Sequence, residues 1–374
     1  MNPIRVLHVV THLNRNGLES RIMDIYRNID RTKVQFDFMI HRNEKSDLGE
    51  EIESLGGRIF MMKRISPKNF FAYLKDLDAF FKEHKEYKIV HAHLNTLSTW
   101  VLLKAKKYGV PVRIAHSRSA NMEKDLKAIP KNFSKLFVNR VATDRFGCSQ
   151  MAGEWLFGKK YANSPAFRVI PNAFEVDQFA WSEEIRQQKR KELGISDDQT
   201  AIINIARLSE AKNHMFLLDV FEEIRKNNTN AQLYLAGSGE CEQKIRDSIR
   251  MRRLEDSVHM LGNRADVAQL YQAADLFVFP SKYEGFGTVL LEAQVTALPV
   301  LASDTIPHET KVCDSVRFMS LKDSAQVWAK AAESMLLTAK RVDNTKLLQD
   351  AGFDIKTQYR IMEEFYLEKG AGSK

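Results

Sequence analysis

The sequence predicts an α/β protein of two domains, each with a parallel β-sheet covered by helices. Short runs of β-branched and aromatic residues alternate with stretches of helical period along most of the chain. This rhythm is typical of a parallel sheet with helices on both faces. A length of 374 residues exceeds what one hydrophobic core usually serves. The 44% of hydrophobic residues suffice for two cores.

The expected elements fall into two series separated by a linker. The first series has strands at residues 4–10, 34–40, 58–62, 89–92, 112–116 and 145–148, and helices at residues 19–29, 48–55 and 70–82. The second has strands at residues 201–206, 232–236, 276–279 and 300–303. Residues 171–182 are polar and without clear periodicity, which indicates a linker. We expect domains over residues 1–180 and 181–350, with a ligand cleft between them at the carboxyl ends of the strands.

Composition restricts the compartment and the partners. No run of about 18 apolar residues occurs and the N-terminus lacks the layout of a signal peptide, so we expect a cytoplasmic protein. Cys148, Cys241 and Cys313 are odd in number and widely spaced, which favours neither disulfides nor a zinc site. The net charge of +8 favours anionic partners, which include nucleic acid, phospholipids and phosphorylated substrates.

The most informative segment is residues 280–293, with the sequence PSKYEGFGTVLLEA. It follows an apolar strand, turns through Gly285 and Gly287 and becomes helical. Glycines let the backbone approach a ligand, and the free N–H groups of the helix start attract phosphate. Glu284 precedes the turn and Glu292 lies in an apolar stretch, so two carboxylates can contact hydroxyl groups of one ligand. Taken singly, they would be interpreted as a loop charge and a solvated helix residue.

This segment resembles the signature of the glycosyl transferases group 1, or family four, which are retaining glycosyltransferases with the GT-B fold. The family pattern is E-G-F-G-x-x-x-x-E-A, and residues 284–293 match it. The resemblance implies two Rossmann-like domains whose parallel sheets face an interdomain cleft. It also implies that Glu284 contacts the transferred sugar and Glu292 the ribose of a nucleotide-sugar donor. Its further donor-binding residues in this turn are Gly285, Phe286, Gly287 and Thr288.

Two basic residues follow the first strand of the second domain. Residues 207–213 read RLSEAKN, which is similar to the R-L-x-x-x-K segment of the family. Arg207 and Lys212 could hold a diphosphate from two directions and neutralise the leaving group, although either alone would be interpreted as a surface charge. The nearby A-G-S-G sequence resembles the G-x-G loop of the family. Glu242 stands where the dinucleotide fingerprint needs its third glycine, which disfavours a nicotinamide dehydrogenase.

The N-terminal half carries weaker matches. The sequence VVTHLNRNGLE resembles the glycine-rich first loop of the family, in which Gly17 matches the second glycine and faces the donor phosphate. Asn16 replaces the first glycine and tolerates a left-handed backbone. His116, in A-H-S-R, matches the histidine beside the donor sugar, and a structural hydrogen-bonding role is the alternative. His91 and His93 are interpreted as cleft-edge residues without an assigned role.

The resemblance extends over nearly the whole chain. The sequence IPNAFEVD resembles the linker entry I-P-N-G-x-D, and the last helix of the family returns to the first domain, which predicts such a helix over residues 351–374. Family membership implies transfer with retention, no cofactor besides the nucleotide-sugar donor, and no essential metal. Asp76 and Asp78 mimic a metal-binding D-x-D but fall in an expected helix, so we interpret them as solvated charges.

The acceptor side is expected in the first domain. Residues 124–140, from Lys124 to Arg140, interleave basic and apolar side chains, which suits docking on an anionic membrane. An ordinary amphipathic helix is the alternative.

We expect a hexosyl- or N-acetylhexosaminyl-transferase that uses a UDP-sugar and a glycan or lipid-linked acceptor of capsule or exopolysaccharide assembly, at the inner face of the plasma membrane. The alternatives are a UDP-sugar 2-epimerase type of GT-B enzyme and a non-catalytic sugar or nucleic-acid binding module. Nucleic acid is not an expected partner, because no recognised binding motif occurs.

Overall fold

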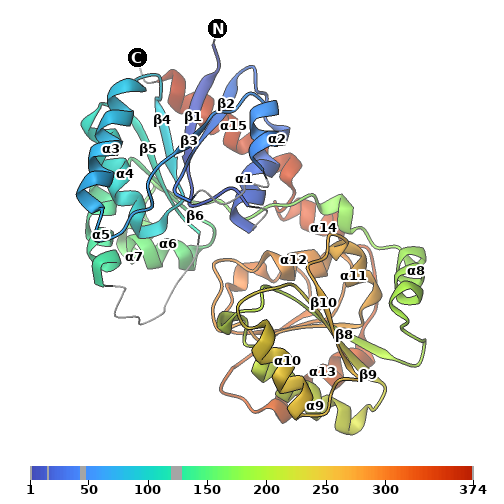
Figure 1. The fold of residues 1–374 in the computed structure, drawn as a ribbon. Helices are drawn as coiled ribbons and strands as arrows, with labels where there is room; N and C mark the ends of the chain where they lie inside the picture. The colour runs from blue at the N-terminus through green and yellow to red at the C-terminus, as the bar shows by residue number, and fades with distance from the viewer. Residues whose placement is uncertain (1, 15–16, 43–47, 119–128, 373–374) are drawn as a thin grey trace. The chain divides into compact units, whose positions relative to one another are not determined.

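The computed structural model describes residues 2–14, 17–42, 48–118 and 129–372, without the side chains of residues 129–133. The chain forms two compact units (Figure 1). The first comprises Met1–Phe174 and Asp354–Lys374, and the second comprises Glu175–Phe353. The sequence places the corresponding boundaries at residues 180 and 351. Both units contain a parallel sheet with helices, which confirms the predicted α/β class of two Rossmann-like domains.

The first unit has a seven-stranded parallel sheet in the order β3-β2-β1-β4-β5-β6-β7. Its strands are β1 Ile4–Val9, β2 Val34–Ile40, β3 Ile59–Met61, β4 Ile89–Ala92, β5 Val112–Ser117, β6 Asp144–Gly147 and β7 Phe167–Val169. The central strands are buried along nearly their whole length because helices cover both faces. The strand order reverses between β1 and β4. Open parallel sheets bind ligands at such a switch point, beyond the carboxyl ends of the strands.

The helices of the first unit come from both ends of the chain. They are α1 Gly17–Asn28, α2 Gly49–Ser54, α3 Phe70–Glu83, α4 Ser98–Lys107, α5 Ile129–Val141, α6 Gln150–Phe157, α7 Lys159–Ala162 and α15 Ile355–Ala371, with a 3-10 turn η1 at Asn95–Leu97. The last helix, α15, packs against α1 and β1 (Figure 1). It buries Met362, Phe365 and Tyr366 in the core that β1 and β2 share. Burial of such side chains is the dominant favourable contribution to folding.

The second unit has a six-stranded parallel sheet in the order β10-β9-β8-β11-β12-β13. Its strands are β8 Thr200–Ile205, β9 Ala231–Ala236, β10 Val258–Gly262, β11 Leu276–Phe279, β12 Val300–Ser303 and β13 Val316–Met319. Its helices are α8 Glu183–Leu193, α9 His214–Asn227, α10 Glu242–Met251, α11 Val267–Ala273, α12 Thr288–Val295, α13 Ala325–Thr338 and α14 Thr345–Asp350, with 3-10 turns η3 Val176–Phe179, η4 Glu210–Lys212 and η5 His308–Thr310. The order reverses between β8 and β11, which creates the switch point of this sheet.

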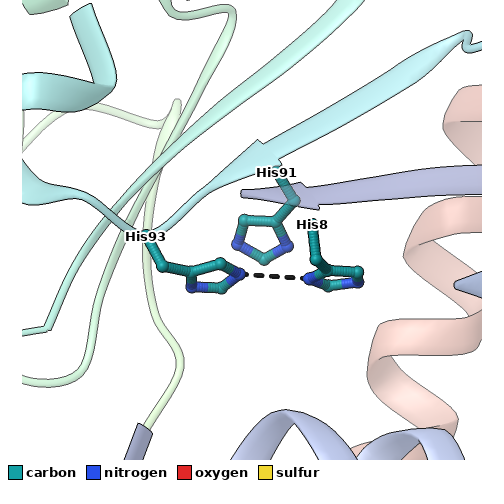
Figure 2. Close-up of side chains that lie close together, drawn as sticks. All are labelled: His8, His91 and His93. Atoms are coloured by element: carbon teal, nitrogen blue, oxygen red, sulfur yellow. Dashed lines mark hydrogen bonds between the residues drawn. The ribbon is translucent and has the colours of Figure 1, made fainter. Parts of the chain in front are cut away.

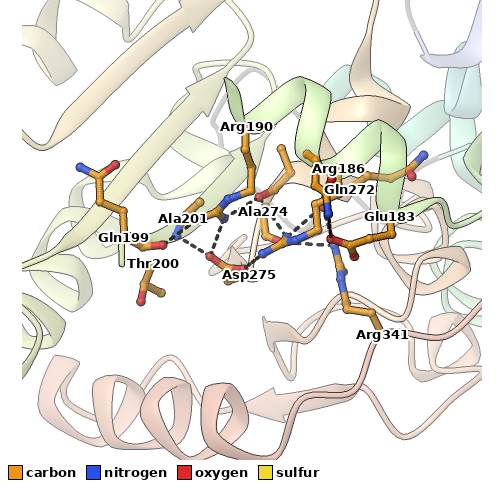
Figure 3. A network of polar contacts seen from close by, with 12 residues as sticks. Glu183, Arg186, Arg190, Gln199, Thr200, Ala201, Gln272, Ala274, Asp275 and Arg341 are labelled. Carbon is orange, nitrogen blue, oxygen red and sulfur yellow. Dashed lines mark hydrogen bonds and ion pairs between the residues drawn. The ribbon is translucent and has the colours of Figure 1, made fainter. Parts of the chain in front are cut away.

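A polar network joins α8 to the amino-terminal ends of β8 and β11 (Figure 3). Arg186 and Arg190 of α8 donate to the Asp275 carboxylate at 2.6 and 3.1 Å. The same carboxylate accepts the backbone N–H of Ala201 at 2.8 Å. Charge-assisted hydrogen bonds of this kind are stronger than neutral ones. They fix the first helix of the second unit against its central strands.

The carboxyl end of α11 is closed by Arg341 (Figure 3). Its guanidinium donates to the backbone carbonyls of Tyr271 and Ala274 at 2.7 and 3.1 Å. A helix leaves its last carbonyls without intrahelical donors, and a positive charge suits the negative end of the helix dipole. Burial lowers the pKa of Arg341 to about 9, so the group stays charged at neutral pH. Tyr271 is thereby fixed in position, which matters for the site below.

No helix in the described part of the chain is both long and apolar enough to cross a membrane.

Candidate functional site

Three predicted motif loops meet at the switch point of the second unit, because β9, β8 and β11 are neighbours in the sheet. The loops after β8 and β9 are joined by the Leu208 N–H, which donates to the Ser238 carbonyl at 2.9 Å. The loops after β8 and β11 are joined by the Lys282 N–H, which donates to the Ala211 carbonyl at 2.7 Å. The three motifs, which are far apart in the sequence, are therefore joined to one another by backbone hydrogen bonds.

The G-S-G loop after β9 needs its glycines for packing. A Cβ atom on Gly237 would lie 2.0 Å from the Ala206 carbonyl oxygen, and one on Gly239 would lie 2.4 Å from the Leu208 carbonyl oxygen. Gly237 also has a φ of +137°, which side-chain-bearing residues rarely adopt. These glycines therefore let two site loops touch through their backbones, a contact that the sequence alone does not show.

Lys212 and Glu284 meet at this switch point. The Lys212 ammonium, at the end of η4, donates to Oε1 of Glu284, and Ser281 donates to the same oxygen at 2.7 Å. The two side chains are 20% and 13% exposed, so the ion pair is shielded but reachable. Oε2 of Glu284 has no hydrogen-bond donor within the described residues. The pair thus offers a cation for an anionic group and a free carboxylate oxygen for a hydroxyl group.

Arg207 lies at the same loop but is held apart from this pair. Its side chain is 72% exposed and pairs with the exposed carboxylate of Glu240 at 3.1 Å. Exposed ion pairs contribute little stability, so a ligand phosphate can compete with Glu240 for the guanidinium. The structure therefore brings Lys212 and Glu284 together and leaves Arg207 as a separate cation. Sequence reasoning missed Glu240 and Ser281, which carry no motif spacing of their own.

The turn before α12 combines a glycine and a helix start. Gly287 has a φ of +89° and caps α12, whose first N–H groups lack intrahelical acceptors. Gly285 and Thr288 lie partly exposed on either side of it. Phe286 is buried and its ring lies 5.9 Å from that of Phe353, between centroids. Phe286 therefore packs in the interior, and only its backbone could contact a donor.

Glu292 is buried in α12, with 7% of its surface exposed. The Tyr271 hydroxyl donates to its Oε2 at 3.3 Å. Burial, and next the Glu292 carboxylate, raise the pKa of Tyr271 well above its usual value, so the phenol keeps its proton and remains a donor. This environment contradicts the alternative of a solvated helix residue.

In the first unit, the predicted histidines lie inside the protein. Gly17 begins α1 and is exposed, whereas Asn16 lies outside the described residues. His116 is fully buried and its Nδ1 lies 3.0 Å from Nε2 of His91. His91 and His93 are buried as well, so their interpretation as edge residues is wrong.

These histidines form a cluster with His8 of β1 at the first switch point (Figure 2). Nδ1 of His8 lies 3.1 Å from Nε2 of His93, and Nδ1 of His91 lies 2.8 Å from the Tyr366 hydroxyl. Ligand atoms of His8, His91 and His93 lie within 4.8 Å of one another, which is close enough to share a metal ion. The sequence predicted no metal site. Sequence reasoning missed His8, although its place near the end of an expected strand matches those of His91 and His116.

The histidine cluster is uncharged at neutral pH. Burial, followed by the charges of nearby groups, lowers the pKa of His91, His93 and His116 well below the usual value. Burial, and next the Arg118 guanidinium, lower the pKa of His8 to about 3. Neutral imidazoles each carry one N–H donor and one acceptor nitrogen.

The remaining predicted features lie on helices. Asp76 and Asp78 are in α3, where Asp76 pairs with Lys63 and Asp78 with Lys104. They follow no strand, as predicted. In the segment of residues 124–140, Lys124 and Lys127 lie outside the described residues. On α5, Val138 is buried while Leu136 is exposed, so the helix has both a core face and an apolar exposed position.

Comparison with known proteins identifies the class. The family "Glycosyl transferases group 1" matches residues 185–346. The putative glycosyltransferase EpsF of Bacillus subtilis is 34% identical over 370 residues, covering 97% of this chain and 96% of EpsF. CapH of Staphylococcus aureus, a capsular polysaccharide biosynthesis glycosyltransferase, is 26% identical over 389 residues, covering 98% of this chain and 99% of CapH. The structure of Anabaena HepE in complex with UDP matches with a TM-score of 0.80 at 18% identity, covering 96% and 99% of the two chains.

The fold and the site thus define a glycosyltransferase of the GT-B type. The chain belongs to the Glycosyl transferases group 1 family, and its relative CapH is a glycosyltransferase of capsular polysaccharide biosynthesis.

Proposed function

We propose that the protein transfers a hexosyl or N-acetylhexosaminyl group from a UDP-sugar to a glycan or lipid-linked acceptor, with retention of the anomeric configuration. The observation that carries this proposal is the pair of Lys212 and Glu284 at the switch point of the second unit. A cation and a carboxylate with one free oxygen suit a ligand that combines phosphate with sugar hydroxyls. The solved complex of HepE with UDP supports uridine as the base.

In the proposed mechanism, the positive groups act on the leaving diphosphate. Lys212, Arg207 and the N-terminus of α12 neutralise the charge that builds on the diphosphate as its bond to the sugar breaks. The free oxygen of Glu284 accepts a hydroxyl of the transferred sugar, and Glu292 accepts ribose hydroxyls. The acceptor hydroxyl attacks the anomeric carbon from the face that the leaving group departs from, and its proton passes to an oxygen of the departing diphosphate. We assign no covalent nucleophile, and no cofactor or metal is part of the proposal.

Thermal unfolding tests the donor. UDP-glucose and UDP-N-acetylglucosamine at about 100 times their dissociation constants are expected to raise the melting temperature by several degrees, because binding stabilises the folded state by about 2.7 kcal/mol. The GDP- and ADP-sugars serve as matched controls and are expected to give a much smaller shift. A shift with only the GDP or ADP series would contradict the choice of uridine, and no shift with any nucleotide sugar would contradict the proposed function.

For the acceptor, we propose a lipid-linked sugar at the cytoplasmic face of the membrane. The support is the basic and apolar segment of residues 124–140 and the role of CapH in capsular polysaccharide biosynthesis. On α5, Lys135 lies 5.1 Å from the centroid of the Trp155 ring and Leu136 is exposed beside it. Basic side chains next to exposed apolar ones suit an anionic lipid surface.

Vesicle sedimentation tests this docking. Replacing Lys127, Lys131 and Lys135 by glutamine is expected to abolish most sedimentation with phosphatidylglycerol vesicles, since each basic residue near such a surface contributes about 1 kcal/mol. A control variant removes three exposed lysines of the second unit, at Lys226, Lys244 and Lys346. If both variants sediment like the unmodified protein, the docking surface is wrong.

A further inference from the structure

One cation of the first unit lies at the switch point without an acidic partner. Arg118 directly follows β5, next to the strands that carry the histidine cluster. Its Nη1 donates to the Asn172 side-chain oxygen at 2.9 Å and its Nε donates to Nδ1 of His93 at 3.3 Å. Both acceptors are neutral. Among residues 2–14, 17–42, 48–118 and 129–372, no carboxylate lies within ion-pair distance of Arg118.

The histidines hold this guanidinium in place. A guanidinium can only donate, so Nδ1 of His93 must be the acceptor and its proton must be on Nε2. That proton is donated to Nδ1 of His8, as the dashed line in Figure 2 marks. The His8 ring in turn packs 4.2 Å from the Phe36 ring, between centroids, inside the core. The chain of hydrogen bonds therefore fixes Arg118 relative to the sheet.

These bonds use two of the three guanidinium nitrogens. Of its five N–H groups, the hydrogens on Nη2 have no acceptor among the described residues. The residue as a whole is partly exposed. Nη2 and Nη1 together form the planar fork that matches two oxygens of a phosphate or carboxylate.

The charge of Arg118 is poorly compensated. Burial lowers its pKa to about 10, which leaves it charged at neutral pH. Glu19 acts on it through space, but burial raises the pKa of Glu19 to about 7, and its carboxylate lies 3.3 Å from Nδ1 of His12. The neighbouring histidines carry no charge. A cation withdrawn from water without a counter-ion is costly, and a bound anion would remove that cost.

We propose that Arg118 binds a phosphate group of a substrate at the switch point of the first unit. The position is where open parallel sheets bind ligands, and Asn172 and His93 orient the fork. Arg118 lies in the first unit, whereas Lys212, Arg207 and α12 lie in the second. The choice of phosphate over carboxylate rests on the proposed function, since nucleotide sugars and lipid-diphosphate-linked sugars both carry phosphate.

Two calorimetric titrations test this proposal and separate the two sources of phosphate. The first adds UDP to the protein, and the second adds inorganic phosphate to protein saturated with UDP. If the phosphate belongs to the donor, Arg118→Gln weakens UDP binding by about tenfold or more. If it belongs to another substrate, the variant keeps its UDP affinity and loses phosphate binding by at least a similar factor.

Two further variants determine how a negative result is interpreted. Arg168→Gln removes an exposed arginine of the same unit and is expected to change either affinity less than twofold. Arg118→Lys keeps the charge without the fork and is expected to weaken binding less than Arg118→Gln. If Arg118→Gln is poorly folded, the Arg118→Lys variant decides whether the proposal holds. Equal affinities of Arg118→Lys and the control Arg168→Gln for UDP and for phosphate would then overturn the proposal. Folded Arg118→Gln with both affinities unchanged also overturns it. Failure of the unmodified protein to bind UDP refutes the proposed donor, while phosphate titration without UDP still tests Arg118.

Discussion

Replacing Lys212 by methionine is expected to lower kcat for release of UDP from UDP-glucose by about a hundredfold or more. In the proposed mechanism, the ammonium neutralises charge that develops on the diphosphate only as the bond breaks, and removal of one such preorganised group typically costs a factor of about 10² to 10³. Methionine keeps most of the length of the side chain but lacks the ammonium, which in Lys212 lies 5.0 Å from the centroid of the Phe279 ring. The measurement is UDP release at saturating donor.

A lysine of the same unit gives the matched control. Lys244 is exposed and pairs with Glu210 on the surface, and Lys244→Met is expected to change kcat by less than twofold. Glu284 keeps its bond from Ser281 in the Lys212 variant, so a large loss of stability is not expected. A Lys212→Met enzyme that retains more than a third of kcat would remove Lys212 from the proposed mechanism.

The Glu292→Ala variant is expected to bind UDP about 10 to 100 times more weakly, as measured by calorimetry. In the proposed mechanism, the buried carboxylate accepts charge-assisted hydrogen bonds from the ribose hydroxyls, and alanine offers no acceptor. The effect should fall on nucleotide affinity more than on kcat, because this contact exists before and during bond breaking.

Tyr271→Phe serves as the control for this prediction. It removes the phenol that donates to Glu292 and leaves the carboxylate itself in place. We expect a loss of UDP affinity of less than about threefold, because only the orientation of the carboxylate is affected. Unchanged UDP affinity in folded Glu292→Ala would count against the assignment of the ribose to this residue.

The sequence predicted the central strands and missed three edge strands. β2 and β9 are buried throughout, and their runs rich in aromatic and aliphatic residues made them recognisable. β7, β10 and β13 lie at sheet edges and are partly exposed, so they lack such runs. An edge strand is held by pairing with a neighbour far away in the sequence, and local patterns do not record that pairing.

The candidate site was predictable where residue types keep a fixed spacing. Glu284 and Glu292 follow such a pattern, and their contact with a donor stays a prediction. The pairing of Lys212 with Glu284 depends on β8 and β11 being neighbours, which only the fold establishes. Arg118 stands in the A-H-S-R sequence beside His116, but the lack of a carboxylate near it is a property of three-dimensional packing.

The return of α15 to the first unit has a consequence for the order of folding. The second unit is one continuous segment, Glu175–Phe353, and can complete its core as soon as that segment has been synthesised. The core of the first unit needs Met362 and Tyr366, which the ribosome adds only after the whole second unit. The N-terminal 174 residues must therefore wait, with the apolar surface under α15 open to solvent, while the later half of the protein folds ahead of them.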